Sequence, residues 1–286
     1  MDIVISSDGT KIAYDVFGEG PAVILVGGAL SFRKFKGMEE LARLLSDRCT
    51  VINYDRRGRG DSTDTAPFAL EREVEDIAAL IEAAGGSASL WGWSPGGALA
   101  LHAAKAEIGV ERISVYEVPF ITDARAERPT PDYGQRLDEL VAADDRDAAV
   151  KHFMRNSMGI PAPIVLMMRM MPIWRDLRAV AHTLPYDWVA LGSQRMYGAP
   201  IDADEWASVT MPALVVAGEK SPKVLRSSSR ALAAALPNAS FRELAGISHS
   251  LKMKALAPVL AEFFGTAAAA TARAGTDAPP RVAPAR

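Results

Sequence analysis

The chain has 286 residues, of which 49% are hydrophobic and 23% charged, as in an ordinary globular protein. Its formal net charge of -3 argues against a nucleic-acid partner, which would require clustered basic residues. No run approaches the ~20 uninterrupted apolar residues of a membrane span, and the N-terminus lacks the basic and apolar regions of a secretory signal. We therefore expect a cytoplasmic protein with no nucleic-acid or membrane partner.

The first part of the chain alternates strand patterns with helical patterns. A hairpin is predicted around Ser7-Asp8-Gly9, where two short alternating segments meet. Continuous apolar runs then predict strands at residues 22–26, 50–54, 88–91 and 113–116. Periodic segments predict helices between them at residues 35–45, 71–84 and 97–104. This order is typical of βαβ units that form a parallel sheet.

The alternation stops at about residue 121 and resumes at about residue 211. The segment between has helical patterns, a polar loop and a patch rich in Met and Trp, which indicates a helical insertion over the sheet edge. A strand at 211–218, a helix at 224–236, a strand at 240–244 and a helix at 256–264 follow. We expect an α/β core over 1–120 and 209–265, a helical cap over 121–208 and a disordered tail over 266–286, where large apolar residues are scarce.

A candidate nucleophile lies at Gly92-Trp93-Ser94-Pro95-Gly96. A strand pattern enters this segment and a small-residue helical pattern leaves it. This is the context in which G-x-S-x-G forms a nucleophile elbow that exposes the serine above a sheet. A nucleophilic serine needs a base, and the chain has four histidines. His249 follows the last predicted strand in a Gly/Ser loop, whereas the others lie in helical patterns or in the insertion and favour structural roles: His102, His152 and His182.

Together these elements resemble the α/β-hydrolase fold over about residues 1–265. The matching parts are the strand ending in Gly27-Gly28, the elbow, the late His249 and a turn at 54–62 that is close to the family's D-x-R-G-x-G-x-S. The resemblance implies a mostly parallel eight-stranded sheet flanked by helices, with a cap. It also implies a structural role for the turn arginines, Arg56, Arg57 and Arg59.

In the family that it resembles, a serine attacks an acyl carbon, a histidine takes its proton and a carboxylate orients the histidine. The resemblance thus implies that Ser94 is the nucleophile and His249 the base. Most members place the acid where this chain has Ser221. Because a hydroxyl cannot stabilise an imidazolium by charge, the acid must come from elsewhere.

A subset that includes haloalkane dehalogenases and fungal resorcylic-lactone hydrolases carries the acid after the strand that follows the elbow helix. Glu117 occupies this place, 23 positions after Ser94 (117 minus 94), and we predict it as the orienting acid, with Glu219 as the alternative. Dehalogenases need an aspartate nucleophile, whereas this chain has Ser94. The similarity to the lactone hydrolases therefore favours an ester or lactone as the substrate.

Pro95 departs from the family pattern. The oxyanion hole normally uses the backbone N–H of the residue after the nucleophile and one from the loop after the first parallel strand. Proline has no N–H. We therefore assign the hole to Gly28 and Ala29, with Leu30 and the Ser31 hydroxyl as further candidates.

The patch in the insertion predicts an apolar pocket. Flexible thioethers suit a bulky apolar substrate, and the candidates for the pocket wall are Met167, Met168, Met171 and Trp174. The alternative is that these side chains only pack the cap onto the core. No nucleotide motif or metal-ligand cluster is evident, and the single cysteine, Cys49, is expected to be inert.

Three functions remain open. The main hypothesis is a cofactor-free, metal-free serine hydrolase acting on a small apolar ester or lactone through an acyl-enzyme. The first alternative is a non-hydrolytic lyase or cyclase on the same fold, which Pro95 and Ser221 motivate. The second is a binding protein without catalysis. The sequence does not indicate an oligomeric state.

Overall fold

The structure is a computed structural model, and it describes residues 1–123, 129–192, 198–250 and 252–274. Within this part of the chain lies one eight-stranded sheet with the order β1-β2-β4-β3-β5-β6-β7-β8. The strands are β1 (Asp2–Ile5), β2 (Lys11–Phe17), β3 (Ala22–Val26), β4 (Thr50–Tyr54), β5 (Ala88–Trp93), β6 (Val110–Tyr116), β7 (Ala213–Gly218) and β8 (Ala239–Leu244). β2 pairs antiparallel with β1 and β4, and the other neighbours are parallel, which confirms the predicted sheet.

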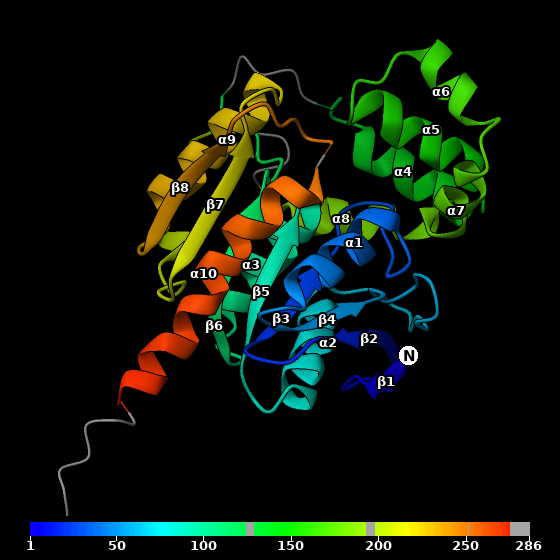
Figure 1. The fold of residues 1–286 in the computed structure, drawn as a ribbon. Coiled ribbons are helices and arrows are strands. Elements are labelled where there is room, and N and C mark those ends of the chain that lie inside the picture. The colour runs from blue at the N-terminus through cyan, green and yellow to red at the C-terminus, as the bar shows by residue number, and fades with distance from the viewer. Residues whose placement is uncertain (124–128, 193–197, 251, 275–286) are drawn as a thin grey trace, which may run out of the picture.

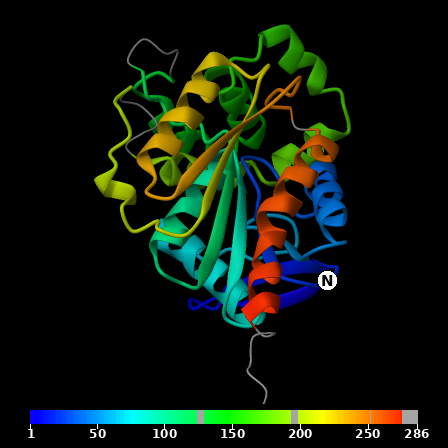
Figure 2. The same cartoon turned by 60° about the vertical axis from the view of Figure 1, so that its left-hand side comes forward.

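Helices cover both faces of this sheet (Figures 1 and 2). α1 (Lys36–Leu45) and α10 (Met253–Ala274) pack together on one face, and α2 (Leu70–Ala83), α3 (Pro95–Lys105) and α9 (Lys223–Ala235) pack on the other. Successive residues of a strand point to opposite faces. In β3, accordingly, Val23 and Leu25 join the α1/α10 layer while Ile24 and Val26 join the opposite layer.

The insertion forms a separate group of helices beside the sheet (Figure 1). It comprises α4 (Tyr133–Ala142), α5 (Arg146–Asn156), α6 (Ala162–Met168), α7 (Ile173–Ala179), the 3-10 turn η1 (Ala181–Thr183) and α8 (Leu184–Ala190). These helices share a hydrophobic cluster of their own, which also contains Leu30 from the core. The end of the insertion behaves differently, because Ala190 and Trp206 in η3 (Asp204–Trp206) pack into the core of the sheet.

The last helix changes the predicted C-terminal boundary. α10 continues to Ala274, so the helix extends past residue 266, where a disordered tail was predicted to begin. Alanine has the highest helix propensity, and the alanine-rich sequence after Gly265 extends a helix whose first turns are anchored in the core. The rest of the predicted tail, 275–286, lies outside the described residues. Among the described helices, none is both long enough and apolar enough to cross a bilayer.

Candidate active site

Ser94 lies on the turn between β5 and α3, at the carboxyl end of the parallel strands. Its backbone is strained, with φ 56° and ψ −128°. A residue other than glycine keeps such a backbone conformation only where the surrounding structure holds it. Its N–H donates to the carbonyl of Tyr116 at 2.9 Å, and its carbonyl accepts from Gly97 at 2.9 Å. A Cβ on Gly96 would lie 2.4 Å from the carbonyl oxygen of Gly27, so this turn requires glycine. The local sequence therefore folds as an elbow.

Glu117 and His249 form a pair at the same edge of the sheet. Nδ1 of His249 lies 2.7 Å from Oε2 of Glu117, and Oε1 of Glu117 accepts the N–H of Gly218 at 2.7 Å. The Glu117 side chain is 0% exposed and that of His249 is 26% exposed. Glu117 follows β6 with φ 48°, and its N–H donates to Val216 at 3.1 Å. Both carboxylate oxygens are therefore held in place, and the imidazole is oriented by one of them.

Tyr116 ties the elbow to the histidine loop. Its carbonyl accepts from Ser94, and its hydroxyl donates to the carbonyl of Ser248 at 2.9 Å. Burial raises the pKa of the Tyr116 hydroxyl, and the neighbouring Glu117 charge raises it further, so the hydroxyl remains a donor. The rings of Tyr116 and Trp93 lie 6.5 Å and 6.4 Å from that of His249. The structure thus brings the three predicted triad residues to one small region.

The alternative acid is engaged elsewhere. Glu219 is exposed, and its Oε2 accepts the N–H of Gly246 at 2.7 Å. Ser221 is buried at the position where an aspartate is usual. Of these candidates, Glu117 is the one that contacts His249.

The loop after β3 lies against the elbow. A Cβ on Gly28 would lie 2.7 Å from the carbonyl oxygen of Trp93 and 3.4 Å from Cβ of Ser94. The Ser31 hydroxyl donates to the carbonyl of Gly28 at 2.7 Å, so its hydrogen is directed at that carbonyl. Ala29 is partly exposed, and Leu30 adopts φ 57° with its side chain buried. Gly28 therefore lies beside the elbow, and the assignment of the oxyanion hole to Gly28 and Ala29 stays a prediction.

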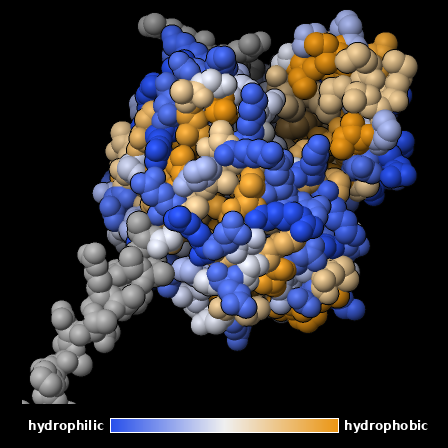
Figure 3. Space-filling model, viewed as in Figure 1, coloured by the Kyte–Doolittle hydropathy of each residue, from blue (hydrophilic) through white to orange (hydrophobic). Residues whose placement is uncertain are grey.

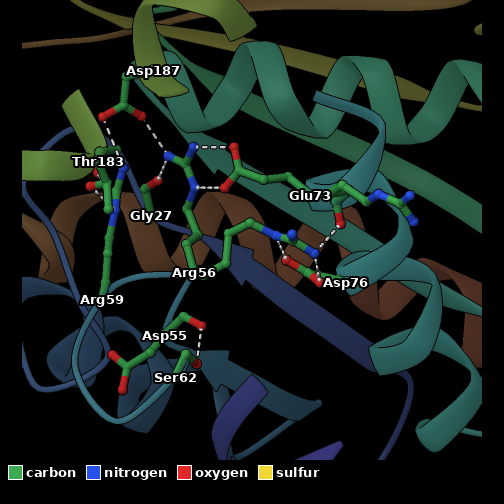
Figure 4. Close-up of polar contacts among 12 residues, drawn as sticks. Gly27, Asp55, Arg56, Arg59, Ser62, Glu73, Asp76, Thr183 and Asp187 are labelled. Atoms are coloured by element: carbon green, nitrogen blue, oxygen red, sulfur yellow. Dashed lines mark hydrogen bonds and ion pairs between the residues drawn. The ribbon is translucent and has the colours of Figure 1, made fainter. Parts of the chain in front are cut away.

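Two turn arginines form a buried charge network with the cap (Figure 4). Arg56 binds Glu73 through two contacts of 2.7 Å and Asp187 of α8 through one of 2.5 Å. Arg59 binds the other oxygen of Asp187 at 2.8 Å. Burial and the neighbouring Arg56 charge lower the pKa of Arg59, while Asp187 and Glu73 act in the opposite direction. We call Arg56, Arg59, Glu73 and Asp187 the buried charge cluster.

The predicted pocket residues lie in different environments. The surface is hollowed beside the cap, where hydrophobic residues gather (Figure 3). Met167 and Met171 are 54% and 49% exposed, and Met168 packs partly against the cap cluster. Trp174 is buried within that cluster, and its Nε1 donates to Asp147 at 2.7 Å. A contact of these side chains with a substrate remains a prediction.

The other histidines are engaged in packing. His102 contacts the carbonyl oxygen of Ala190 at 3.1 Å, and His152 contacts that of Tyr133 at 3.1 Å. In the part of the chain that the structure describes, no group of three or more His, Cys, Asp or Glu side chains could hold a metal ion. His249 is thus the histidine that lies with Ser94 and Glu117.

A strained serine between a strand and a helix, with a carboxylate–histidine pair at the same sheet edge, is the arrangement of an α/β hydrolase. A model of the alpha/beta hydrolase family matches residues 23–259. The chain belongs to this family.

Several known proteins are similar to the chain. An alpha/beta hydrolase from Sphaerobacter thermophilus has 45% identity and a TM-score of 0.84, with 92% of this chain and 100% of that one covered. An enol-lactonase from Burkholderia xenovorans has 20% identity and a TM-score of 0.62, with 95% and 100% covered. A thermophilic esterase from Thermogutta terrifontis has 22% identity and a TM-score of 0.60, with 95% and 97% covered. The last two share the fold alone.

A curated relative is much longer than this chain. Polyketide synthase ThaQ from Burkholderia thailandensis is 26% identical over 258 residues, which cover 82% of this chain but 11% of that protein. The chain thus corresponds to a small part of that synthase.

Sequence reasoning did not foresee the role of Asp187. The arginines were assigned to a structural turn, and nothing in the sequence pairs residue 187 with residue 59. An aspartate inside an otherwise apolar helical segment at 184–190 was the available signal, because a buried carboxylate requires a partner.

Proposed function

We propose that the chain is a serine hydrolase that cleaves a carboxylic ester or lactone with an apolar acyl or ring portion. The observation that carries the proposal is the 2.7 Å contact between His249 and Glu117, at the edge where Ser94 has its strained backbone. The fold relatives named esterase and enol-lactonase support this choice of substrate class. Three side chains supply the nucleophile, the base and the acid, so the reaction requires no cofactor.

The hydrogen bonding of His249 determines its role. The Glu117 carboxylate accepts the Nδ1–H of His249, which leaves Nε2 unprotonated as a base for the Ser94 hydroxyl. Ser94 Oγ attacks the acyl carbon as its proton moves to Nε2. The imidazolium that forms is stabilised by the ionised Glu117, and its proton then passes to the leaving alkoxide.

The acyl-enzyme is then hydrolysed by the same groups. Nε2 of His249 takes a proton from water, the hydroxide attacks the acyl carbon, and the proton returns to Ser94 Oγ as the acid leaves. During both steps a negative charge develops on the acyl oxygen. The N–H of Ala29 is the donor that we assign to this oxygen, since Pro95 has no N–H.

Ser94→Ala tests this function. We expect hydrolysis of p-nitrophenyl butyrate to fall by about 10⁶-fold, and labelling by a fluorophosphonate to disappear from the intact-mass spectrum. Ser87→Ala is the matched control, because this exposed serine precedes the opposite end of β5. If Ser94→Ala keeps full esterase activity and the unmodified protein is not labelled, the proposed function is wrong.

A second candidate is a lyase or cyclase on the same fold. The observation that favours it is Pro95 at the first position of α3, which removes a donor that acyl transfer normally uses. Such an enzyme would depend on His249 without forming an acyl-enzyme. Acylated Ser94 in intact-mass spectra after mixing with an activated ester would support the hydrolase and exclude this alternative.

A further inference from the structure

Arg59 joins the cap to the loop beside the elbow. Its Nη1 donates to the carbonyl oxygens of Gly28 at 2.6 Å and of Ser31 at 3.2 Å. On its other side, Nε donates to Oγ1 of Thr183 at 2.9 Å and Nη2 donates to Oδ2 of Asp187 at 2.8 Å (Figure 4). The side chain is 1% exposed. The plane of the guanidinium is therefore fixed by the core on one side and by the cap on the other.

The contact with Gly28 determines the direction of the next amide. In a planar trans peptide the C=O and the N–H point in opposite directions. The carbonyl of Gly28 is directed at Arg59 and at the Ser31 hydroxyl, so the N–H of Ala29 points away from them. This peptide lies beside the nucleophile, because a Cβ on Gly28 would be 3.4 Å from Cβ of Ser94.

The cap holds the same loop at a second point. Leu30 has φ 57°, a conformation that is costly for a branched side chain. Its side chain is 4% exposed and belongs to the hydrophobic cluster of the cap, together with Tyr133 and Leu137. The loop is thus held by apolar packing through Leu30 and by hydrogen bonds through Arg59.

We propose that Arg59, held by Asp187 and Thr183 of the cap, is a positioning residue of the oxyanion hole. By fixing the carbonyl of Gly28, it aims the N–H of Ala29 at the acyl oxygen that becomes negative when Ser94 attacks. The inference rests on the proposed serine-hydrolase function and makes the cap part of it. The absence of an N–H at Pro95 increases the dependence of the reaction on this loop.

Glu73 provides a matched control for Asp187. Both carboxylates lie in the buried charge cluster, where Glu73 is 2% exposed and Asp187 is 4% exposed. Glu73 holds Arg56 through both oxygens, whereas Asp187 divides its oxygens between Arg56 and Arg59. Glu73→Gln and Asp187→Asn therefore remove the same charge from the same cluster, but only the second neutralises a carboxylate in direct contact with Arg59.

The experiment compares these two variants in the full-length chain. For Asp187→Asn we expect kcat for p-nitrophenyl butyrate to fall by about 10- to 100-fold with KM within about 3-fold, because an oxyanion donor acts mainly in the transition state. Inhibition by an alkyl boronic acid, which imitates the tetrahedral intermediate, should weaken in parallel. For Glu73→Gln we expect kcat within about 3-fold of that of the unmodified protein.

Equal losses of kcat in both folded variants, or an unchanged kcat in Asp187→Asn, would overturn the positioning role. If Asp187→Asn does not fold, Thr183→Val removes the acceptor for Nε of Arg59 and retains the shape of the side chain. We expect it to lower kcat by about 3- to 10-fold, and an unchanged kcat would also overturn the role. Fluorophosphonate labelling of unmodified Ser94 tests the hydrolase function separately, so failure of the two proposals can be distinguished.

Discussion

At the residue scale, the acid that we propose for the triad follows β6, and Ser221 lies where the family pattern led us to expect an aspartate. The Glu117 side chain is 0% exposed, and its two carboxylate oxygens contact His249 and Gly218. A carboxylate in this state cannot turn away from the imidazole without leaving a buried acceptor unpaired. Glu117 therefore fixes the orientation of His249, and in the proposed mechanism it also selects the tautomer with the proton on Nδ1.

Glu117→Gln is expected to lower kcat by about 10³- to 10⁴-fold without unfolding the protein. The Gln carbonyl can still accept from Gly218, but its amide group donates toward Nδ1 and favours the wrong tautomer of His249. The measurement is steady-state kinetics combined with thermal unfolding. Glu219→Gln is the control, since its carboxylate accepts from Gly246 in an exposed loop. Similar losses in the two variants would remove Glu117 from the triad.

Pro95→Ala is expected to increase activity. Alanine at the first helical position has an N–H and adopts the φ of proline without strain, so the elbow gains the donor that the fold normally provides. One oxyanion donor is worth about 10²- to 10³-fold in kcat, and we expect at least about a 10-fold rise in kcat/KM for p-nitrophenyl butyrate. A folded variant with unchanged or lower activity would show that this position does not face the oxyanion.

At the scale of elements, the strands and helices of the core were predictable because each local pattern of apolar residues is compatible with one type of element. The apolar runs at 22–26 and 50–54 correspond to β3 and β4, and the helical period at 71–84 corresponds to α2 within a residue. The glycine-rich elbow was predictable for the same reason. These segments obtain their structure from backbone sterics and from burial against their immediate neighbours.

The helices of the insertion were predictable, but the environment of their side chains was not. Met167 and Trp174 lie in the same apolar patch of the sequence, yet one is 54% exposed and the other 5%. Periodicity does not distinguish a helix that faces its own cluster from one that faces a pocket. The contact between Asp187 and Arg59 could not be predicted from local patterns either, because it joins residues 128 positions apart in the sequence.

Substitutions in the cap separate packing from substrate binding. Met167→Ala should change the free energy of unfolding by no more than about 0.5 kcal/mol. If the Met167 side chain lines the pocket, the substitution should also raise KM for p-nitrophenyl octanoate more than KM for p-nitrophenyl acetate. Trp174→Phe should cost about 1–3 kcal/mol, because Asp147 loses its buried donor. Thermal unfolding and KM for the two esters provide the measurements. An unchanged KM ratio in Met167→Ala would exclude Met167 from the pocket wall.

At the scale of the whole molecule, the insertion and the core form a joint structure. Trp206 packs into the core of the sheet, and Leu30 of the core packs into the cap. His102 of α3 contacts the carbonyl of Ala190 across the same junction at 3.1 Å. Stability should therefore respond to the charge of this histidine.

Burial lowers the pKa of His102 below its ordinary value of 6.5. Above that pH both folded and unfolded states are neutral at this residue. As the pH falls below 6.5, the unfolded chain takes up a proton that the folded chain does not, so the free energy of unfolding decreases until the lower folded pKa is passed. Urea unfolding between pH 7.5 and 5 should show this decline.

His102→Gln should lose part of this pH dependence. Glutamine carries no titrating group near neutral pH, and its amide can still donate to Ala190. The remaining decline belongs to other groups, including His182, whose pKa burial also lowers. Parallel curves of unfolding free energy against pH for the two proteins would exclude His102 as a contributor.

The buried charge cluster also affects chimeric proteins built on this chain. Replacing residues 121–208 with the insertion of another hydrolase would remove Asp187, so that Arg56 keeps its ion pair with Glu73 while Arg59 loses its ion pair. An uncompensated buried charge costs about 3–5 kcal/mol, a large fraction of the stability of a typical domain. A transplanted cap must therefore bring its own carboxylate at the position of Asp187, or both arginines must be replaced with it.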